Sequence, residues 1–158
     1  MKSPNPWFNV SSPNPLYKWG ADFNHESIHT QNLVDRITSY WLTEYNIDGF
    51  RFDFTKGFTN TSGEGTPYDA SRINILKRMA YKVWSVNTNA YVILEHFAAN
   101  EEEKELAGYG MMLWGNCNYS FGEAAMGFNS DLTSASYAGR GWNQPHLVTY
   151  MESHDEER

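Results

Sequence analysis

Short strand patterns that alternate with helical patterns limit the fold of this sequence more than any other feature. Apolar residues recur at helical spacing over 30–45 and 69–86, and the intervening segment 47–54 alternates strictly, as a strand does. Further strand patterns lie at 90–95, 109–114 and 146–153, and further helical patterns begin at 100 and 118. Strands that alternate with helices favour parallel pairing under helical cover. The sequence therefore predicts an α/β fold, either an open doubly wound sheet or part of a (β/α)8 barrel.

Length and charge exclude several classes of protein. The chain has 158 residues, enough for one domain of roughly 150 but too few for a complete barrel of about 250. Its net charge is −7, without the basic stripe that nucleic acid requires, so we expect no nucleic-acid partner. No apolar run is long enough to span a membrane, so no membrane partner is expected. Residues 1–26 predict an extended loop without the apolar core of a signal peptide, and the location stays undetermined, although an extracellular or periplasmic one is compatible.

Three of the four strand patterns lead into an acidic residue. Asp53 lies one residue before the end of its pattern, Glu95 ends its pattern, and Asp155 follows the last one. Parallel strands in βα units point their carboxyl ends the same way, and such folds keep their active sites at that face. The three carboxylates are therefore expected to gather on one face of the sheet.

The first strand pattern also places a positive charge beside an acid. Side chains alternate along a strand, so Arg51 and Asp53 share one face while the phenylalanines at 50, 52 and 54 share the other. Arg51 would keep Asp53 ionised and oriented, as a carboxylate nucleophile requires. Glu95, at the end of an apolar run, is suited to donate a proton. Paired carboxyl groups in these two roles are typical of retaining glycoside hydrolysis, although a structural Arg–Asp pair with two surface acids remains an alternative.

Three segments carry a resemblance to a known family. Residues 48–56 (DGFRFDFTK), 93–97 (ILEHF) and 150–155 (YMESHD) resemble the strand-four, strand-five and strand-seven signatures of the α-amylase family of glycoside hydrolases. Their order and approximate spacing also agree with that family, so the resemblance covers most of the chain. It implies a partial (β/α)8 TIM barrel, roughly strands four to seven with their helices. The substrate class it implies is α-linked glucans such as starch or maltodextrin.

The resemblance also implies a role for each matching residue. Asp53 would form the covalent glycosyl-enzyme, and Glu95 would act as general acid and then as base. Asp155 would stabilise the oxocarbenium-like transition state, and Arg51 would orient Asp53. His154 would form a hydrogen bond with the sugar in the cleavage subsite.

Two further residues are candidates for substrate binding. Lys56 is placed to reach a sugar on the leaving-group side, and Phe97, just past Glu95, is a candidate for stacking on a sugar face. Many family members carry His directly after this lysine, whereas this chain has Gly57, which weakens substrate contacts from that position. The resemblance leaves calcium open for a full-length enzyme, but no cofactor or metal ligand set is identifiable in this chain.

The resemblance begins after the family's strand-three signature and ends before an eighth strand. We therefore expect residues 1–158 to be a single central fragment of an amylase-type catalytic domain, with little activity of its own. An α-glucan transglycosylase or branching enzyme would share the three carboxylates. A non-catalytic carbohydrate-binding or structural piece is an alternative of another class.

Several other motifs have a simpler explanation. His25, Glu26 and His29 match the HExxH pattern of zinc peptidases, but the residues before them are not helical in pattern and no third ligand is evident. Zinc chemistry is therefore a remote alternative. The acidic run 101–103 predicts a solvated helix start, and Met111, Met112 and Trp114 are assigned to the core.

Overall fold

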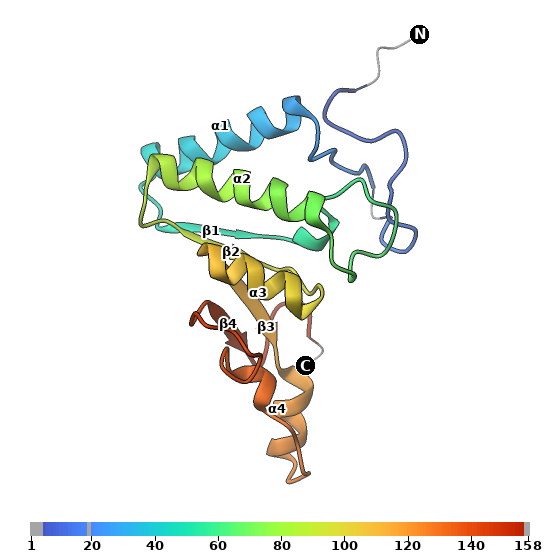
Figure 1. The fold of residues 1–158 in the computed structure, drawn as a ribbon, viewed down its shortest axis with the longest axis vertical. Coiled ribbons are helices and arrows are strands. Elements are labelled where there is room, and N and C mark those ends of the chain that lie inside the picture. Colours follow the sequence, from blue (N-terminus) through green and yellow to red (C-terminus); the bar gives the residue numbers. More distant parts are fainter. Residues whose placement is uncertain (1–4, 19, 157–158) are drawn as a thin grey trace.

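The computed structural model describes residues 5–18 and 20–156, in which four parallel strands form one sheet (Figure 1). The strands are β1 (Gly49–Phe52), β2 (Tyr91–Leu94), β3 (Met112–Asn116) and β4 (Leu147–Tyr150). The α-helices are α1 (Ile28–Glu44), α2 (Ala70–Val86), α3 (Asn100–Tyr109) and α4 (Asn118–Ala125), and the 3-10 turns are η1 (Thr55–Gly57) and η2 (Thr133–Ala135). The sheet order β1-β2-β3-β4 follows the chain without the reversal of a doubly wound sheet. The predicted α/β class is confirmed, and the arrangement is consistent with a partial barrel.

Helix boundaries follow the capping chemistry of the sequence. The side chain of Ser27 accepts a hydrogen bond from the backbone N–H of His29 at the start of α1. The Asp69 carboxylate accepts hydrogen bonds from two backbone N–H groups at the start of α2. At its carboxyl end α3 stops at Gly110, whose φ of 118° suits a residue without a Cβ.

The hydrophobic core lies between the sheet and the helices α2 and α3. Along β2 the side chains alternate: Val92 is 1% exposed on the helix side, whereas Tyr91 is 57% exposed on the other side. Replacing a buried leucine such as Leu94 by alanine typically lowers the free energy of unfolding by about 2–5 kcal/mol. The principal core residues are Ile73, Leu76, Met79, Ala80, Val83, Val92, Leu94, Leu106, Ala107, Met111 and Leu113.

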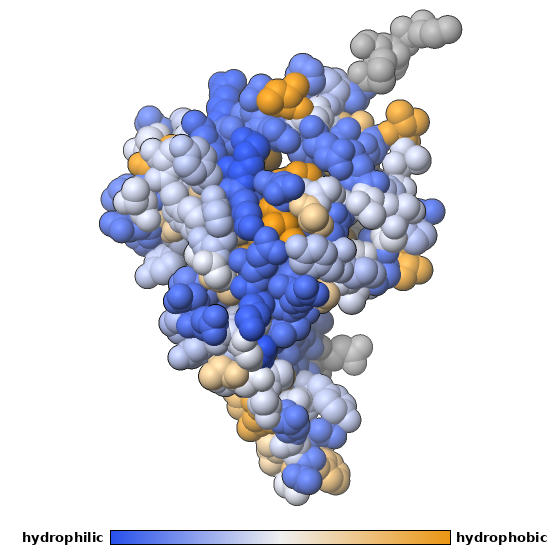
Figure 2. Space-filling model, viewed as in Figure 1, coloured by the Kyte–Doolittle hydropathy of each residue, from blue (hydrophilic) through white to orange (hydrophobic). Residues whose placement is uncertain are grey.

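Helices α1 and α2 lie side by side across the sheet, and α4 extends from the far end of the molecule (Figure 1). The face seen in Figure 2 is mainly hydrophilic, with hydrophobic atoms visible near its centre. No helix in the described part of the chain is long and apolar enough to cross a membrane.

The predicted strand 47–54 is longer than β1, which ends at Phe52. Phe50 and Phe52 pack against the core, as their shared face requires. Phe54 does not: its φ of 45° is left-handed, and it begins the turn into η1. The predicted alternation therefore fails for Phe54 because the chain has already left the strand.

Residues 5–18 and 20–27 form a loop that lies against the loop following β1. Phe8 and Phe23 form an isolated antiparallel bridge, and their rings contact edge to face. Asn9 Nδ2 donates to Asn60 Oδ1 at 2.8 Å. These contacts bring the two loops together beside the carboxyl end of β1.

Candidate active site

Two of the predicted carboxylates meet one guanidinium at the carboxyl ends of β1 and β2. Asp53 follows β1 directly, and Glu95 follows β2 directly. Arg51 Nη1 contacts Asp53 Oδ1, and its Nη2 lies 3.0 Å from Glu95 Oε1. The register explains this geometry, because Arg51 pairs with Ile93 and Glu95 lies two residues beyond that pair on the same face. Sequence reasoning expected the contact with Asp53 but not the bridge to Glu95.

The two carboxylates differ in their access to solvent. The Asp53 side chain is 75% exposed, whereas that of Glu95 is 11% exposed. Glu95 Oε2 accepts a hydrogen bond of 2.7 Å from the backbone N–H of Phe54. One carboxylate is therefore open to an incoming molecule, and the other is held by a backbone donor and by Arg51.

An aromatic pair from the other two strands lies beside this centre. The Arg51 guanidinium carbon is 4.1 Å from the Trp114 ring centroid, and the Trp114 and Tyr150 rings are 4.8 Å apart. Trp114 is half-buried rather than a core residue, so its assignment to the core is wrong, whereas Met111 is fully buried as expected. Counting the alternation back along β3 would have placed Trp114 on the face of Arg51.

Asp155 and His154 lie in the loop after β4, at the same end of the sheet. Because the strand ends at Tyr150, both side chains are free of the strict alternation that would separate them. His154 Nε2 is 3.5 Å from Asp155 Oδ2, and both side chains are exposed. In the described residues no direct contact joins Asp155 to Asp53 or to Glu95.

The Tyr150 hydroxyl responds to several of these carboxylates. Burial, together with the negative charges of Glu156, Glu95 and Asp155, raises the pKa of Tyr150 to about 12, against the opposing charge of Arg51. Carboxylates that follow β2 and β4 therefore act on the same phenol.

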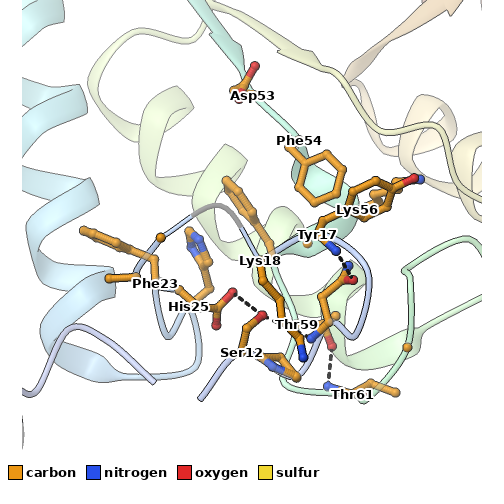
Figure 3. A pocket seen from close by; sticks show the side chains of 18 residues that line it. Ser12, Tyr17, Lys18, Phe23, His25, Asp53, Phe54, Lys56, Thr59 and Thr61 are labelled. Atoms are coloured by element: carbon orange, nitrogen blue, oxygen red, sulfur yellow. Dashed lines mark hydrogen bonds between the residues drawn. The ribbon is translucent and has the colours of Figure 1, made fainter. Parts of the chain in front are cut away.

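A cavity of about 170 Å³ opens beside Asp53, between the loop after β1 and the amino-terminal loop (Figure 3). Lys56 lies in it next to Tyr17 and Phe54, with its Nζ 5.2 Å and 5.6 Å from the two ring centroids (Figure 3). Its ammonium group is also 3.8 Å from Glu64 Oε2. Phe97, with a left-handed φ of 52°, is half-buried in the loop between β2 and α3.

The HExxH residues do not form the arrangement that zinc peptidases use. Helix α1 begins at Ile28, so His25 and Glu26 precede it and do not share a helix face with His29. The His25 ring stacks on Phe58 with centroids 3.7 Å apart, and burial lowers the pKa of His25 to about 4. Within residues 5–18 and 20–156, no group of three or more His, Cys, Asp or Glu is arranged to hold a metal ion.

The acidic run at the start of α3 corrects a further expectation. Glu101 is exposed, but Glu102 and Glu103 are buried, so the prediction of a solvated run is wrong for both. Each has an arginine partner more than 25 residues away in the sequence: Arg72 Nε is 2.7 Å from Glu102, and Arg140 Nη1 is 2.9 Å from Glu103. Local sequence carries no signal for pairs formed by such long-range packing.

Comparison with known proteins gives a likeness of fold. No family model matches the sequence, and no curated protein matches it. Among solved structures, Amy13B of Eubacterium rectale is similar over 71% of this chain, with a TM-score of 0.56 and 21% sequence identity. The chain spans 22% of the length of that protein, whose name marks it as an amylase. The likeness shows an amylase-like fold.

Proposed function

We propose that this chain carries the nucleophile and the acid/base of a retaining glycoside hydrolase acting on α-linked glucans such as starch or maltodextrin. The observation that carries the proposal is the contact of Arg51 with both Asp53 and Glu95 at neighbouring strand ends. The amylase-like fold supports the coarser part of the proposal, the glycoside hydrolase class. The three segments that resemble the α-amylase signatures support the finer part.

The proposed reaction has two displacements at the anomeric carbon. In the first, an Asp53 oxygen bonds to that carbon, the bond to the leaving oxygen breaks, and Glu95 gives its proton to the leaving oxygen. In the second, Glu95 takes a proton from water, whose oxygen bonds to the anomeric carbon and displaces Asp53. Two inversions return the original configuration.

The surroundings of each carboxylate fit these roles. The exposed Asp53 can approach a sugar, while Arg51 orients it. The Phe54 N–H at Oε2 and the Arg51 guanidinium at Oε1 hold the Glu95 carboxyl group in a defined orientation. We propose that Asp155 and His154 bind sugar hydroxyls at the cleavage point, and that Lys56 and Phe97 contact the neighbouring sugar.

The 158-residue chain alone is expected to hydrolyse little substrate. In its described part, β1 and β4 are the edge strands of an open sheet, and Tyr91, on the face away from the helices, is largely exposed. A complete barrel would close both edges and surround the substrate. Activity is therefore best tested in the full-length polypeptide, meaning everything that its coding sequence specifies.

The test is hydrolysis of maltooligosaccharides by the full-length polypeptide, with the configuration of the first product followed by NMR. We expect retention, with losses of roughly 10³-fold or more in Asp53→Asn and about 10²–10⁴-fold in Glu95→Gln. Glu101→Gln, an exposed acid on α3, is the matched control and should keep full activity.

Three outcomes would contradict the proposal. Inverted product would exclude the covalent intermediate, and transfer products longer than the substrate would indicate a transglycosylase or branching enzyme. Absence of turnover by the full-length polypeptide would favour a non-catalytic carbohydrate-binding or structural role. Strong turnover by the 158-residue chain, lost in Asp53→Asn, would overturn the expectation that further strands are needed.

A further inference from the structure

A chain of buried polar side chains runs from the helix layer to the turn that holds Glu95. Its members are Arg72 on α2, Glu102 on α3, His96 after β2 and Thr55 after β1, and each is at most 1% exposed. Arg72 Nε and Nη2 each lie 2.7 Å from a Glu102 oxygen. His96 Nε2 is 2.9 Å from Glu102 Oε1, and its Nδ1 is 2.9 Å from Thr55 Oγ1. Four buried polar side chains, each in contact with the next, therefore link two helices to two strand ends.

The chain ends on Glu95 through the backbone. Thr55 donates its backbone N–H to the Glu95 carbonyl oxygen at 2.8 Å, and its hydroxyl oxygen is 3.0 Å from the same carbonyl. The preceding residue, Phe54, donates its N–H to the Glu95 carboxylate. Phe54 adopts a left-handed conformation that non-glycine residues rarely take, and such strain persists only where surrounding contacts hold it.

The donors and acceptors determine where the protons lie. Although burial opposes it, hydrogen bonds from His96 and Arg72 lower the pKa of Glu102, so this carboxylate only accepts. His96 Nε2 must then carry a proton. Burial lowers the pKa of His96, against the attraction of Glu102, so its ring is neutral and Nδ1 is an acceptor. The single Thr55 hydroxyl proton lies between two acceptors, Nδ1 at 2.9 Å and the Glu95 carbonyl oxygen at 3.0 Å, and this carbonyl also accepts from the Thr55 N–H.

We propose that His96 is a positioning residue for Glu95: its Nε2–H tautomer, set by Glu102, leaves Nδ1 to accept a hydrogen bond from the Thr55 hydroxyl, and this bond fixes the Phe54–Thr55 turn that holds the Glu95 carboxylate beside Arg51. The inference rests on the proposed function, because it supposes that Glu95 is the acid/base. It assigns His96 a role through Thr55 and not through contact with substrate. The preorganised position of Glu95 is what the network supplies.

Two variants at Thr55 test the hydroxyl: one is nearly isosteric but lacks it, and the other keeps it but lacks the methyl group. Thr55→Val keeps the shape and loses the hydroxyl, whereas Thr55→Ser keeps the hydroxyl. The first readout is amide hydrogen exchange at Phe54 in the 158-residue chain. We expect exchange about tenfold or more faster in Thr55→Val, relative to core amides of β2, and near-normal exchange in Thr55→Ser. Equal exchange at Phe54 in all three proteins would overturn the proposal.

The second readout is the ¹⁵N spectrum of the His96 ring. We expect a protonated Nε2 and an unprotonated, hydrogen-bonded Nδ1, with the Nδ1 signal shifted in Thr55→Val and restored in Thr55→Ser. The opposite tautomer would overturn the proposal. Should Thr55→Val fail to fold, His96→Gln, whose amide can keep the Glu102 contact but loses the Thr55 contact, replaces it and is expected to accelerate Phe54 exchange, and unchanged exchange would overturn the proposal.

The third readout is the split between kcat and KM for maltooligosaccharide hydrolysis by the full-length polypeptide. Thr55→Val should lower kcat about 10²-fold with little change in KM, and Thr55→Ser should restore it. An equal loss in both variants would contradict positioning by the hydroxyl. If the wild-type polypeptide hydrolyses no glucan, the proposed function fails, while the exchange and ring spectra still decide whether the network holds the turn.

Discussion

Arg51 and Glu95 lie on neighbouring parallel strands, and their side chains approach to 3.0 Å between Nη2 and Oε1. The same guanidinium contacts Asp53 through its other terminal nitrogen. A single planar cation therefore sets the relative positions of two carboxylates. Trp114 stacks beneath that cation and limits its movement.

Replacing Arg51 tests this arrangement directly. Lysine keeps the charge but presents one ammonium, so Arg51→Lys cannot bridge both carboxylates in the same geometry. We expect kcat for maltooligosaccharides to fall about 10²-fold in the full-length polypeptide, because small misplacements of reacting groups carry such losses. Arg78→Lys is the control, because Arg78 on α2 pairs with Asp35 on α1, away from the two carboxylates. Its kcat should stay within about twofold of the wild-type value. Equal activity of the two variants would argue against the bridge.

Much of this arrangement could be predicted from the sequence. Alternation along residues 47–54 placed Arg51 and Asp53 on one face, and the strand-end position of Glu95 placed it at the same edge. These features are local, since they depend only on side-chain direction within a strand. The contact between Arg51 and Glu95 depends on the register between strands, which local pattern does not contain.

The buried ion pairs could not be predicted from the sequence, for a different reason. Glu102 has the sequence context of a solvated helix start, and only packing against α2 brings Arg72 to it. His96 follows the candidate acid/base directly but carries no pattern that shows it to be buried. Both became evident once the helix layer was placed over the sheet.

The Arg72–Glu102 pair is predicted to be essential for stability. Glu102→Gln leaves a buried guanidinium without its counter-charge, and such losses typically cost about 3–5 kcal/mol. Glu105 lies on α3, as Glu102 does, and is the partly exposed partner of Lys77 on α2. Glu105→Gln should therefore lower the free energy of unfolding by only about 0–1 kcal/mol. Urea unfolding of the 158-residue chain measures both. Similar costs for the two variants would show that burial does not distinguish the pairs.

Gly49 is predicted to be required at the start of β1. A Cβ at this position would overlap the backbone of Tyr91 on the paired strand. Gly49→Ala should therefore destabilise the chain by roughly 1–3 kcal/mol or more. Gly108→Ala, on α3, meets open space and should stabilise it by about 0.5–1 kcal/mol. Thermal or urea unfolding that shows no difference in sign would disprove the close approach of β1 to β2.

Glu103 should make the stability of the fold depend on pH. Burial raises its pKa from 4.5 to about 7, outweighing the attraction of Arg140 at 2.9 Å. In the folded state Glu103 therefore keeps its proton to a higher pH than it does in the unfolded state. The raised pKa contributes up to about 3 kcal/mol to the free energy of unfolding. This contribution is fully present below pH 4.5 and is lost as the pH rises through about 7.

The neutral variant Glu103→Gln removes this titration. Relative to the variant, the wild type should lose about 1–3 kcal/mol of unfolding free energy between about pH 4.5 and pH 7.5. Glu101→Gln, which alters an exposed acid on the same turn, should show no such change. A constant difference between wild type and Glu103→Gln across this range would contradict the raised pKa.

The central claim is that Asp53 becomes covalently linked to the sugar, and trapping that intermediate tests it most directly. The full-length polypeptide is incubated with a slowly hydrolysed fluorinated α-glycosyl fluoride, digested, and the labelled peptide is sequenced by mass spectrometry. The account predicts one sugar on Asp53, with no label in Asp53→Asn. A label on another residue, or the same label in Asp53→Asn, would contradict it.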